Sequence, residues 1–288
     1  IPRGALGPTS IGAYRTLLGA VVLAAIAGLR RESLRPSRRG LAFTTLAGLL
    51  FAGDLYVWHR SIGRVGSGLA TILGNTQVFW TALLGVGLLG ERLSARFLLA
   101  VPVALVGIAL ATGVAGGDAA ERVDAVGVAL GLGTALFYAA YIHAIRAGRA
   151  AVGAMGPVAQ MAWTSAACGV ALTLIASFEG TFVAPPDGRT VACLVGLALV
   201  AQVFGWVTLA RCIPRVPVAF AGLLLLLQPV FAVVWEMLFF HRSFTGLQVA
   251  GAVLTLLAIY GGSLARYGPA TAAPAVGGEP PSAGAARR

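Results

Sequence analysis

Long apolar runs alternate with short polar connectors along almost the whole chain. Most runs approach the roughly 20 residues that a helix needs to cross the ~30 Å hydrocarbon core of a bilayer. They are continuous, whereas the strands of a membrane barrel would alternate apolar and polar positions. The pattern therefore predicts an all-α integral membrane protein with helices at about 10–29, 41–61, 65–89, 97–115, 125–146, 156–178, 190–210, 216–240 and 246–265.

The third and fourth predicted helices, with the charged turn between them, are repeated 151 positions later. With this offset Gln77 falls on Gln228, and Ser94 falls on Thr245, which opens the last helix in the same way. The helix at 125–146 has no counterpart in the first half, so we expect that the first of ten helices is absent from this chain. Five helices per repeat is an odd number, which predicts two repeats of inverted topology.

The duplication divides the chain into three predicted regions. Residues 1–115 form a first repeat that lacks its first helix, and residues 125–265 form a second repeat. Residues 266–288 are rich in Pro, Ala, Gly and Ser and have no apolar periodicity. We expect this tail to be disordered and cytoplasmic.

Composition and charge agree with a membrane location. The chain is 58% hydrophobic and 11% charged, against about 25% charged residues in soluble domains. Its net charge of +11 comes from arginine, since the sequence has no lysine. These arginines stand singly or in small groups between apolar runs, which favours a role in topology over nucleic-acid binding. Placing the loop at 30–39 in the cytoplasm puts most of them on that side.

Three short segments carry a resemblance to a known family. They are the turn Gly90-Glu91-Arg92-Leu93-Ser94, the helix-internal Gln228-Pro229-Val230, and the Ala- and Gly-rich closing helix from Gly251 to Gly262. Together with the two repeats, they make residues 10–265 resemble the EamA branch of the drug/metabolite transporter (DMT) superfamily. The resemblance implies a ten-helix carrier of the plasma (inner) membrane, with cytoplasmic termini and a central cavity between the repeats. The second repeat departs from this pattern, because Phe240-His241-Arg242-Ser243 replaces the turn that holds Glu91.

Polar side chains near the middle of predicted helices are candidates for a solute site. They are costly in hydrocarbon and usually face a cavity or a neighbouring helix. Two deep tryptophans could line the same space. The predicted substrate-binding residues are Asn75, Thr76, Gln77, Trp80, Tyr138, Gln202, Trp206 and Gln228. Hydrogen bonding between helices and core packing are the alternative explanations of these residues.

Asp54 is the candidate for proton coupling, because a partly buried carboxylate can take up and release a proton. The alternative is that Asp54 forms an ion pair with Arg60, His59 or another arginine. Glu236 lies near the outer end of its predicted helix, where it is expected to reach the interface or to pair with Arg242 or His241.

We predict a secondary transporter that exports amino acids, small metabolites or drugs by alternating access. The chain has no P-loop motif, and its three cysteines match no metal or redox spacing, so we expect no cofactor, metal or catalytic residue. The expected partners are a small-molecule solute and the lipid bilayer, without nucleic acid. One alternative is a flippase of lipids or lipid-linked sugars. A membrane-embedded transferase would need clustered Asp, His or Glu, which are scattered here. The oligomeric state is left open, with a homodimer as one alternative.

Overall fold

The computed structural model describes residues 6–89, 94–111, 124–151, 155–208, 228, 231–232, 234–235, 237–239 and 244–266. In this part of the chain no strand occurs, only an isolated bridge between Ser33 and Met155. Six helices are long and apolar enough to cross a membrane, and two shorter apolar helices accompany them. The prediction of an all-α membrane protein is therefore confirmed.

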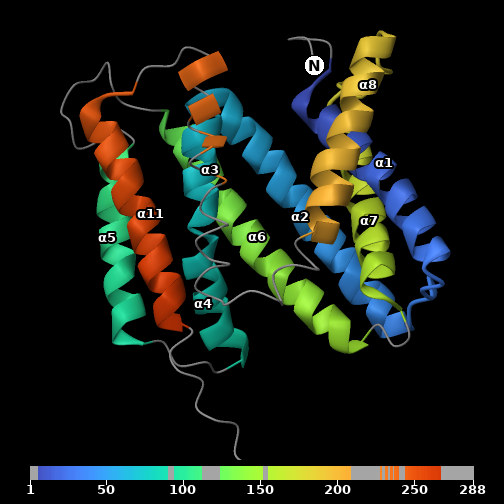
Figure 1. Cartoon of the computed structure of the whole chain (residues 1–288), viewed down its shortest axis with the longest axis horizontal. Coiled ribbons are helices and arrows are strands. Elements are labelled where there is room, and N and C mark those ends of the chain that lie inside the picture. Colours follow the sequence, from blue (N-terminus) through green and yellow to red (C-terminus); the bar gives the residue numbers. More distant parts are fainter. Residues whose placement is uncertain are drawn as a thin grey trace, which may run out of the picture.

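The predicted spans appear as helices wherever the structure describes them (Figure 1). The span at 65–89 is broken at Thr76 into two helices, and the span at 190–210 continues from an α-helix into a π-helix, η3. The helices are α1 (Pro8–Leu29), α2 (Arg38–Val65), α3 (Ser67–Asn75), α4 (Gln77–Leu89), α5 (Ala95–Ala111), α6 (Ala125–Ala151), α7 (Pro157–Phe178), α8 (Gly188–Leu197), η3 (Ala198–Gly205) and α11 (Gly246–Arg266).

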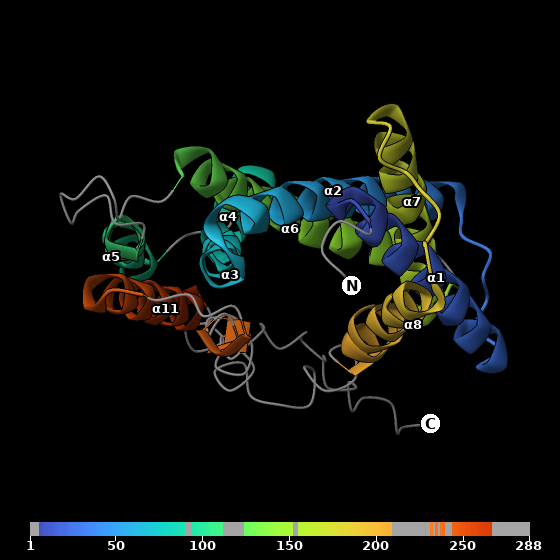
Figure 2. The ribbon, with the colours of Figure 1, turned by 90° about the horizontal axis from the view of Figure 1, so that it is seen from above.

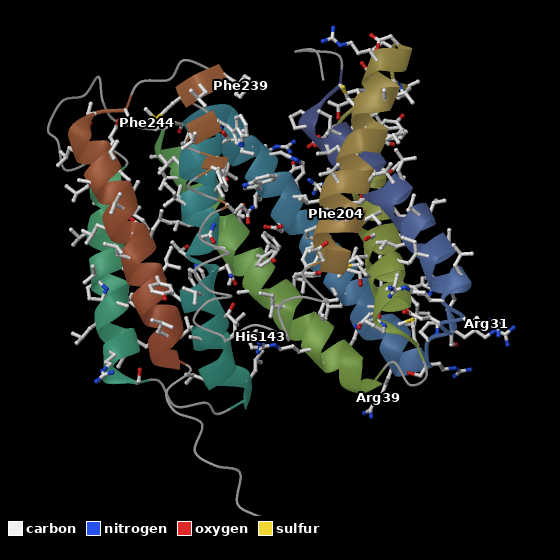
Figure 3. The ribbon with its side chains drawn as sticks, in the orientation of Figure 1. Arg31, Arg39, His143, Phe204, Phe239 and Phe244 are labelled. Atoms are coloured by element: carbon white, nitrogen blue, oxygen red, sulfur yellow. The ribbon has the colours of Figure 1, made fainter. Side chains whose placement is uncertain are left out.

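Some predicted features lie outside the described residues. These are most of the span at 216–240 with Pro229 and Glu236, the turns at 90–93 and 240–243, and nearly all of the tail at 266–288. Of the charged connectors, the basic loop after α1 is described. Arg31 and Arg39 lie at one end of the molecule, and Phe239 and Phe244 lie at the opposite end (Figure 3).

Equivalent helices of the two repeats begin and end in the same way. Both α1 and α7 start with a proline after an extended glycine, which suits the first helical turn because proline lacks an N–H. Both end with a residue in the left-handed conformation, Arg31 with φ 56° and Gly180 with φ 66°. At the C-terminal end of each of these two helices, two backbone hydrogen bonds close a Schellman motif. This match sets the offset between α1 and α7 at 149 residues, slightly shorter than the 151 that holds at Ser94 and Thr245.

The helices α1 and α7 pack side by side in opposite directions (Figure 1). The Glu32 carboxylate, just after α1, accepts hydrogen bonds of 3.0 and 3.1 Å from the backbone N–H groups of Val158 and Ala159 at the start of α7. At the other end, the Ser10 hydroxyl near the start of α1 donates a 2.8 Å bond to the carbonyl of Thr181, after α7. Because α1 and α7 are equivalent, their antiparallel contact is the arrangement that inverted repeats require.

A second antiparallel pair, α5 and α11, lies at the opposite side of the molecule from α1, α7 and α8 (Figure 2). Small residues allow this close approach. A Cβ atom added at Gly251 of α11 would lie 2.6 Å from the Gly107 carbonyl oxygen of α5. Glycine at such crossings lets helix backbones touch within a membrane.

The helices α2, α3, α4 and α6 lie between the two antiparallel pairs (Figure 2). Within this group, the Ser61 hydroxyl of α2 donates a 2.8 Å bond to the Gly127 carbonyl of α6. The Gly127 and Gly131 pair, four residues apart, faces Val65 and Leu73. The long α2–α6 contact therefore forms one wall of the central space.

Candidate functional site

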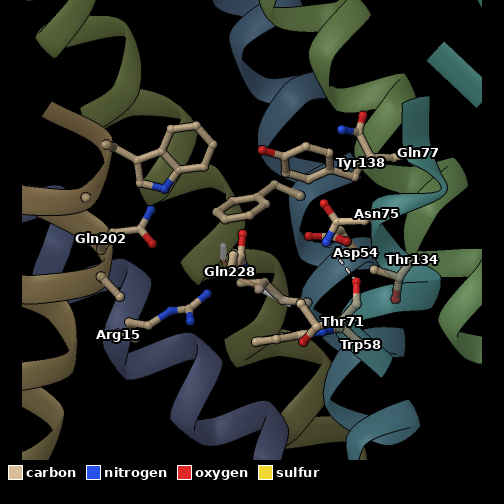
Figure 4. Close-up of a pocket in the computed structure, with 16 residues that line it drawn as sticks. Arg15, Asp54, Trp58, Thr71, Asn75, Gln77, Thr134, Tyr138, Gln202 and Gln228 are labelled. Atoms are coloured by element: carbon tan, nitrogen blue, oxygen red, sulfur yellow. Dashed lines mark hydrogen bonds between the residues drawn. The ribbon is translucent and has the colours of Figure 1, made fainter. Parts of the chain in front are cut away.

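A cavity of about 300 Å³ lies among the central helices and the α1–η3 side of the molecule (Figure 4). Its lining is mostly polar or aromatic, and it draws on both halves of the chain. The polar lining residues are Arg15, Asp54, Thr71, Asn75, Gln77, Thr134, Gln202 and Gln228, and the aromatic ones are Phe51, Trp58, Tyr138 and Trp206. The volume falls at the lower end of the range of small-molecule sites, about 300–1,000 Å³.

The structure brings most of the predicted site residues to this cavity. Those that line it are Asp54, Asn75, Gln77, Tyr138, Gln202, Trp206 and Gln228. Thr76 and Trp80 are not among the lining residues; Thr76 is buried, and its hydroxyl donates a 2.6 Å bond to the Leu73 carbonyl. Their roles in binding remain predictions.

The break between α3 and α4 explains why Asn75 and Gln77 line the cavity although Thr76, between them, does not. On a continuous helix, Asn75, Thr76 and Gln77 would point about 100° apart and could not share one face. The turn at Thr76 interrupts the helix, so that Asn75 at the end of α3 and Gln77 at the start of α4 both reach the cavity. A helix broken at a cavity wall is a recurring feature of transporter sites.

Sequence reasoning missed five polar or aromatic lining residues: Arg15, Phe51, Trp58, Thr71 and Thr134. Arg15 lies seven residues into α1, about 10 Å from its start at ~1.5 Å per residue. The signal that could have identified it is an arginine inside an otherwise apolar run, which is costly without a function.

Three buried polar atoms that lack hydrogen-bond partners belong to residues that line this cavity. They are Arg15 Nε, Asp54 Oδ1 and Thr134 Oγ1. Asp54 is only 6% exposed. Within the described part of the chain, neither Arg15 nor Asp54 forms an ion pair, and Arg60 pairs with Glu179 instead. Buried polar groups are normally paired, so unpaired ones around a cavity mark a place where a ligand or water would bind.

The amide side chains are partly held by the protein itself. Gln202 donates a 2.9 Å bond to the Ser165 hydroxyl of α7, so hydrogen bonding between helices is real for this residue. The Asn75 side-chain amide donates to the Thr71 backbone carbonyl at 2.8 Å. The Gln77 side-chain oxygen, Oε1, accepts a bond from the Thr81 hydroxyl at 3.1 Å. Each amide still lines the cavity, and these bonds fix its orientation there.

Gln202 and Gly205 belong to the π-helix η3. Such segments are uncommon and are frequently found at functional sites, because the wider turn displaces side chains from their α-helical positions. Here the segment places Ala201, Gln202 and Gly205 along the cavity wall.

Aromatic rings connect three helices beside the cavity. Phe51 of α2 stacks on Tyr141 of α6 with ring centroids 5.2 Å apart, and it meets Trp206 edge-on at 6.1 Å. Tyr141 also meets Trp206 at 6.0 Å and Tyr138 at 5.6 Å. These rings pack against one another, and Phe51, Tyr138 and Trp206 also line the cavity.

A cluster around Glu179 joins the two halves of the chain at one end of the helices. The Glu179 carboxylate lies 2.6 Å from an Arg60 guanidinium nitrogen and accepts a 2.8 Å bond from the Tyr56 hydroxyl. The Arg60 guanidinium also covers the Tyr56 ring at 3.6 Å. The Tyr56 and Arg60 bonds hold the pKa of Glu179 below its usual range. The contact ties α2 to the segment after α7.

His143 lies away from the cavity lining, with Nε2 3.0 Å from the Thr81 carbonyl oxygen. Among the residues that the structure describes, no group of three or more His, Cys, Asp or Glu side chains is placed to hold a metal ion.

These features define a multi-pass membrane protein in which two inverted repeats enclose a polar cavity. The sequence model of the EamA-like transporter family matches residues 2–113 and 125–264, once for each repeat. The chain belongs to the EamA-like transporter family.

Comparison with solved structures agrees with this fold. Matches extend to 14 chains. One, titled only "Crystal structure of protein", is 20% identical, with 91% of this chain and 88% of that chain covered and a TM-score of 0.60. At this identity the likeness shows the fold alone. No curated protein matches the chain.

Proposed function

We propose that this membrane transporter is a secondary carrier, which exports a small polar solute such as an amino acid, metabolite or drug through the central cavity. The observation that carries the proposal is the cavity itself. Polar groups from α1, α2, α3, α4, α6 and η3 converge on about 300 Å³ of space inside an otherwise apolar bundle. Inverted repeats suit alternating access, because rocking one repeat against the other exposes such a site to each side in turn.

We further propose that Asp54 couples export to proton entry. Its side chain is buried at the cavity wall, and one carboxylate oxygen has no hydrogen-bond partner in the described structure. A buried carboxylate without a fixed partner can exchange a proton when the cavity opens to water. Uptake of the proton would then compete with, or accompany, release of the solute.

Transport into inverted membrane vesicles and proteoliposomes tests both parts. A panel of amino acids, amines and cationic drugs is assayed with and without a pH gradient, because uptake into inverted vesicles reports export. Asp54→Asn is compared with Asp124→Asn, a matched change at an exposed carboxylate that pairs with Arg64 at 2.6 Å. We expect Asp54→Asn alone to lose the response to the gradient.

The outcomes separate the two claims. If a solute moves and Asp54→Asn still responds to the pH gradient like Asp124→Asn, the carrier function stands and the proton role of Asp54 is wrong. If no solute moves under any condition, export of these classes is rejected.

A lipid flippase is the second candidate function. A separate cavity of about 150 Å³ between α3, α5 and α11 is lined by apolar side chains, including Leu69, Ile72, Val249 and Leu256, and by Gln248. Such a lining suits an acyl chain. Scrambling of fluorescent phospholipids in the same proteoliposomes, without solute transport, would favour this alternative.

A further inference from the structure

We infer that Arg15 determines the specificity of the cavity, because its guanidinium group binds a carboxylate group of the transported solute. The inference rests on the proposed carrier function and goes further by assigning a role to a residue and a chemical group to the ligand. Arg15 lines the cavity from α1, and Asp54 of α2 lies on the opposite side (Figure 4).

The first argument is that Arg15 has no fixed partner among the residues that the structure describes. Its Nε atom is buried and makes no hydrogen bond, and no carboxylate of the described residues lies within ion-pair distance. Its neighbours on α1 are already satisfied. Thr16 donates to the Gly12 carbonyl at 2.8 Å, and Tyr14 donates to the Val183 carbonyl at 3.1 Å. A guanidinium left unpaired inside a membrane bundle is costly, so its retention points to an anion that binds part of the time.

The second argument is the division of the cavity into two chemically different ends. Arg15 lies on the same side as Gln202, whereas Asp54 lies across the cavity with Asn75 and Thr134 (Figure 4). The two opposite charges therefore face one space without neutralising each other by direct contact. An anionic group of a solute is attracted to the Arg15 end and repelled from the Asp54 end, which fixes the orientation of the solute.

The third argument concerns the type of anion. The planar fork of arginine donors matches the two oxygens of a carboxylate, and such bidentate pairs are strong and directional. The amide of Gln202, held by its 2.9 Å bond to Ser165, lies beside this fork as a neutral neighbour. Aromatic side chains also line the cavity, which suits an apolar or aromatic body on the same solute.

The test uses matched solute pairs that differ only in the carboxylate: phenylalanine against phenylalaninamide, and leucine against leucinamide. Transport and quenching of tryptophan fluorescence are measured for the wild type, Arg15→Gln, Arg15→Lys and the control Arg64→Gln, whose arginine forms an exposed pair outside the cavity. We expect the wild type and Arg64→Gln to prefer the carboxylates. Arg15→Gln should raise KM for the carboxylates roughly 10- to 100-fold with little change for the amides. Arg15→Lys should fall between.

The inference is overturned if the wild type handles each acid and its amide equally, or if Arg15→Gln weakens both members of a pair to the same extent. The second result would mean that Arg15 only balances the charge of Asp54. If Arg15→Gln fails to fold, Arg15→Lys, which keeps the positive charge, is compared with the wild type in its place. If the wild type binds and transports neither member of any pair, the proposed export of amino acids fails, which is a different result from a carrier that ignores the carboxylate.

Discussion

The crossing of α5 and α11 provides a quantitative test of the inter-repeat packing. A Cβ atom at Gly251 would lie 2.6 Å from the Gly107 carbonyl oxygen and 2.6 Å from the Cβ of Leu110. This is about 0.8 Å shorter than the 3.4 Å at which ordinary contact begins. The oxygen belongs to a helix backbone and cannot rotate away, so Gly251→Ala must push the two helices apart. Overpacking of this kind costs about 1–3 kcal/mol.

Gly261→Ala is the matched control, because it lies on the same helix and its added Cβ would meet nothing within 4 Å. Both substitutions gain the same helix propensity, about 1 kcal/mol. Their difference in the free energy of unfolding therefore isolates the steric cost, which we expect to be about 1–3 kcal/mol in favour of Gly261→Ala. Equilibrium unfolding in mixed detergent and SDS micelles measures it.

Gly107→Ala adds a second check from the other side of the same crossing, since its Cβ would lie 2.7 Å from the backbone nitrogen of Thr255. Once either substitution has separated the helices, the second should cost less, so the double variant should be less destabilised than the sum. Equal stability of Gly251→Ala and Gly261→Ala would refute the close approach of α5 and α11.

Two further predictions concern the helix ends. Glu179→Gln removes the charge that pairs with Arg60, and we expect a loss of about 0.2–1 kcal/mol at pH 7 because the pair is partly exposed. The Tyr56 and Arg60 bonds lower the pKa of Glu179, so this stabilisation is present above the unfolded pKa, about 4.3, and is lost as the pH falls through the folded value. Unfolding at pH 7 and pH 3 tests this sign, and a difference between wild type and variant that grows in acid would contradict it. Asp187→Ala removes the 2.6 Å cap on the Thr190 N–H of α8 and should cost about 0.5–2 kcal/mol, whereas Asp187→Asn should cost little. Thermal unfolding of the three proteins compares them, and equal losses in both variants would rule out the cap.

The order of the described helices and their repeat relation could be predicted because bilayer thickness imposes a simple length rule on the sequence. The inverted arrangement also followed from counting, since an odd number of helices per repeat reverses the second one. The small offset difference between α1/α7 and α5/α11 could not be seen, because sparse identity leaves a shift of one or two residues undetected. Helix caps such as Gly7-Pro8 and Gly156-Pro157 carry that information, and they become decisive only when their geometry is known.

Choosing polar residues near the middle of the predicted helices identified neutral polar groups that line the cavity. The same choice failed for residues whose position depends on tertiary structure. Arg15 was missed because a charged residue off-centre is usually a topology signal. Thr134 was missed because a lone threonine in a helix usually bonds its own backbone, as Thr164 does with the Gln160 carbonyl at 2.9 Å. Thr76 was included because depth alone cannot show that a helix breaks at that residue.

The different chemistry at the two ends of the α1–α7 pair has a thermodynamic consequence. In a carrier with perfect internal symmetry, the states open to either side would have equal energy. Here the carboxylate of Glu179, after α7, binds the side chains of Arg60 and Tyr56 of α2 at one end. At the other end, the carboxylate of Glu32, after α1, binds backbone N–H groups of α7. In the proposed alternating access, opening either end would break a different set of bonds, so the two states would differ in population at rest. The solute-free protein would then prefer the conformation that is open to one side of the membrane, and residues that do not line the cavity would set this preference.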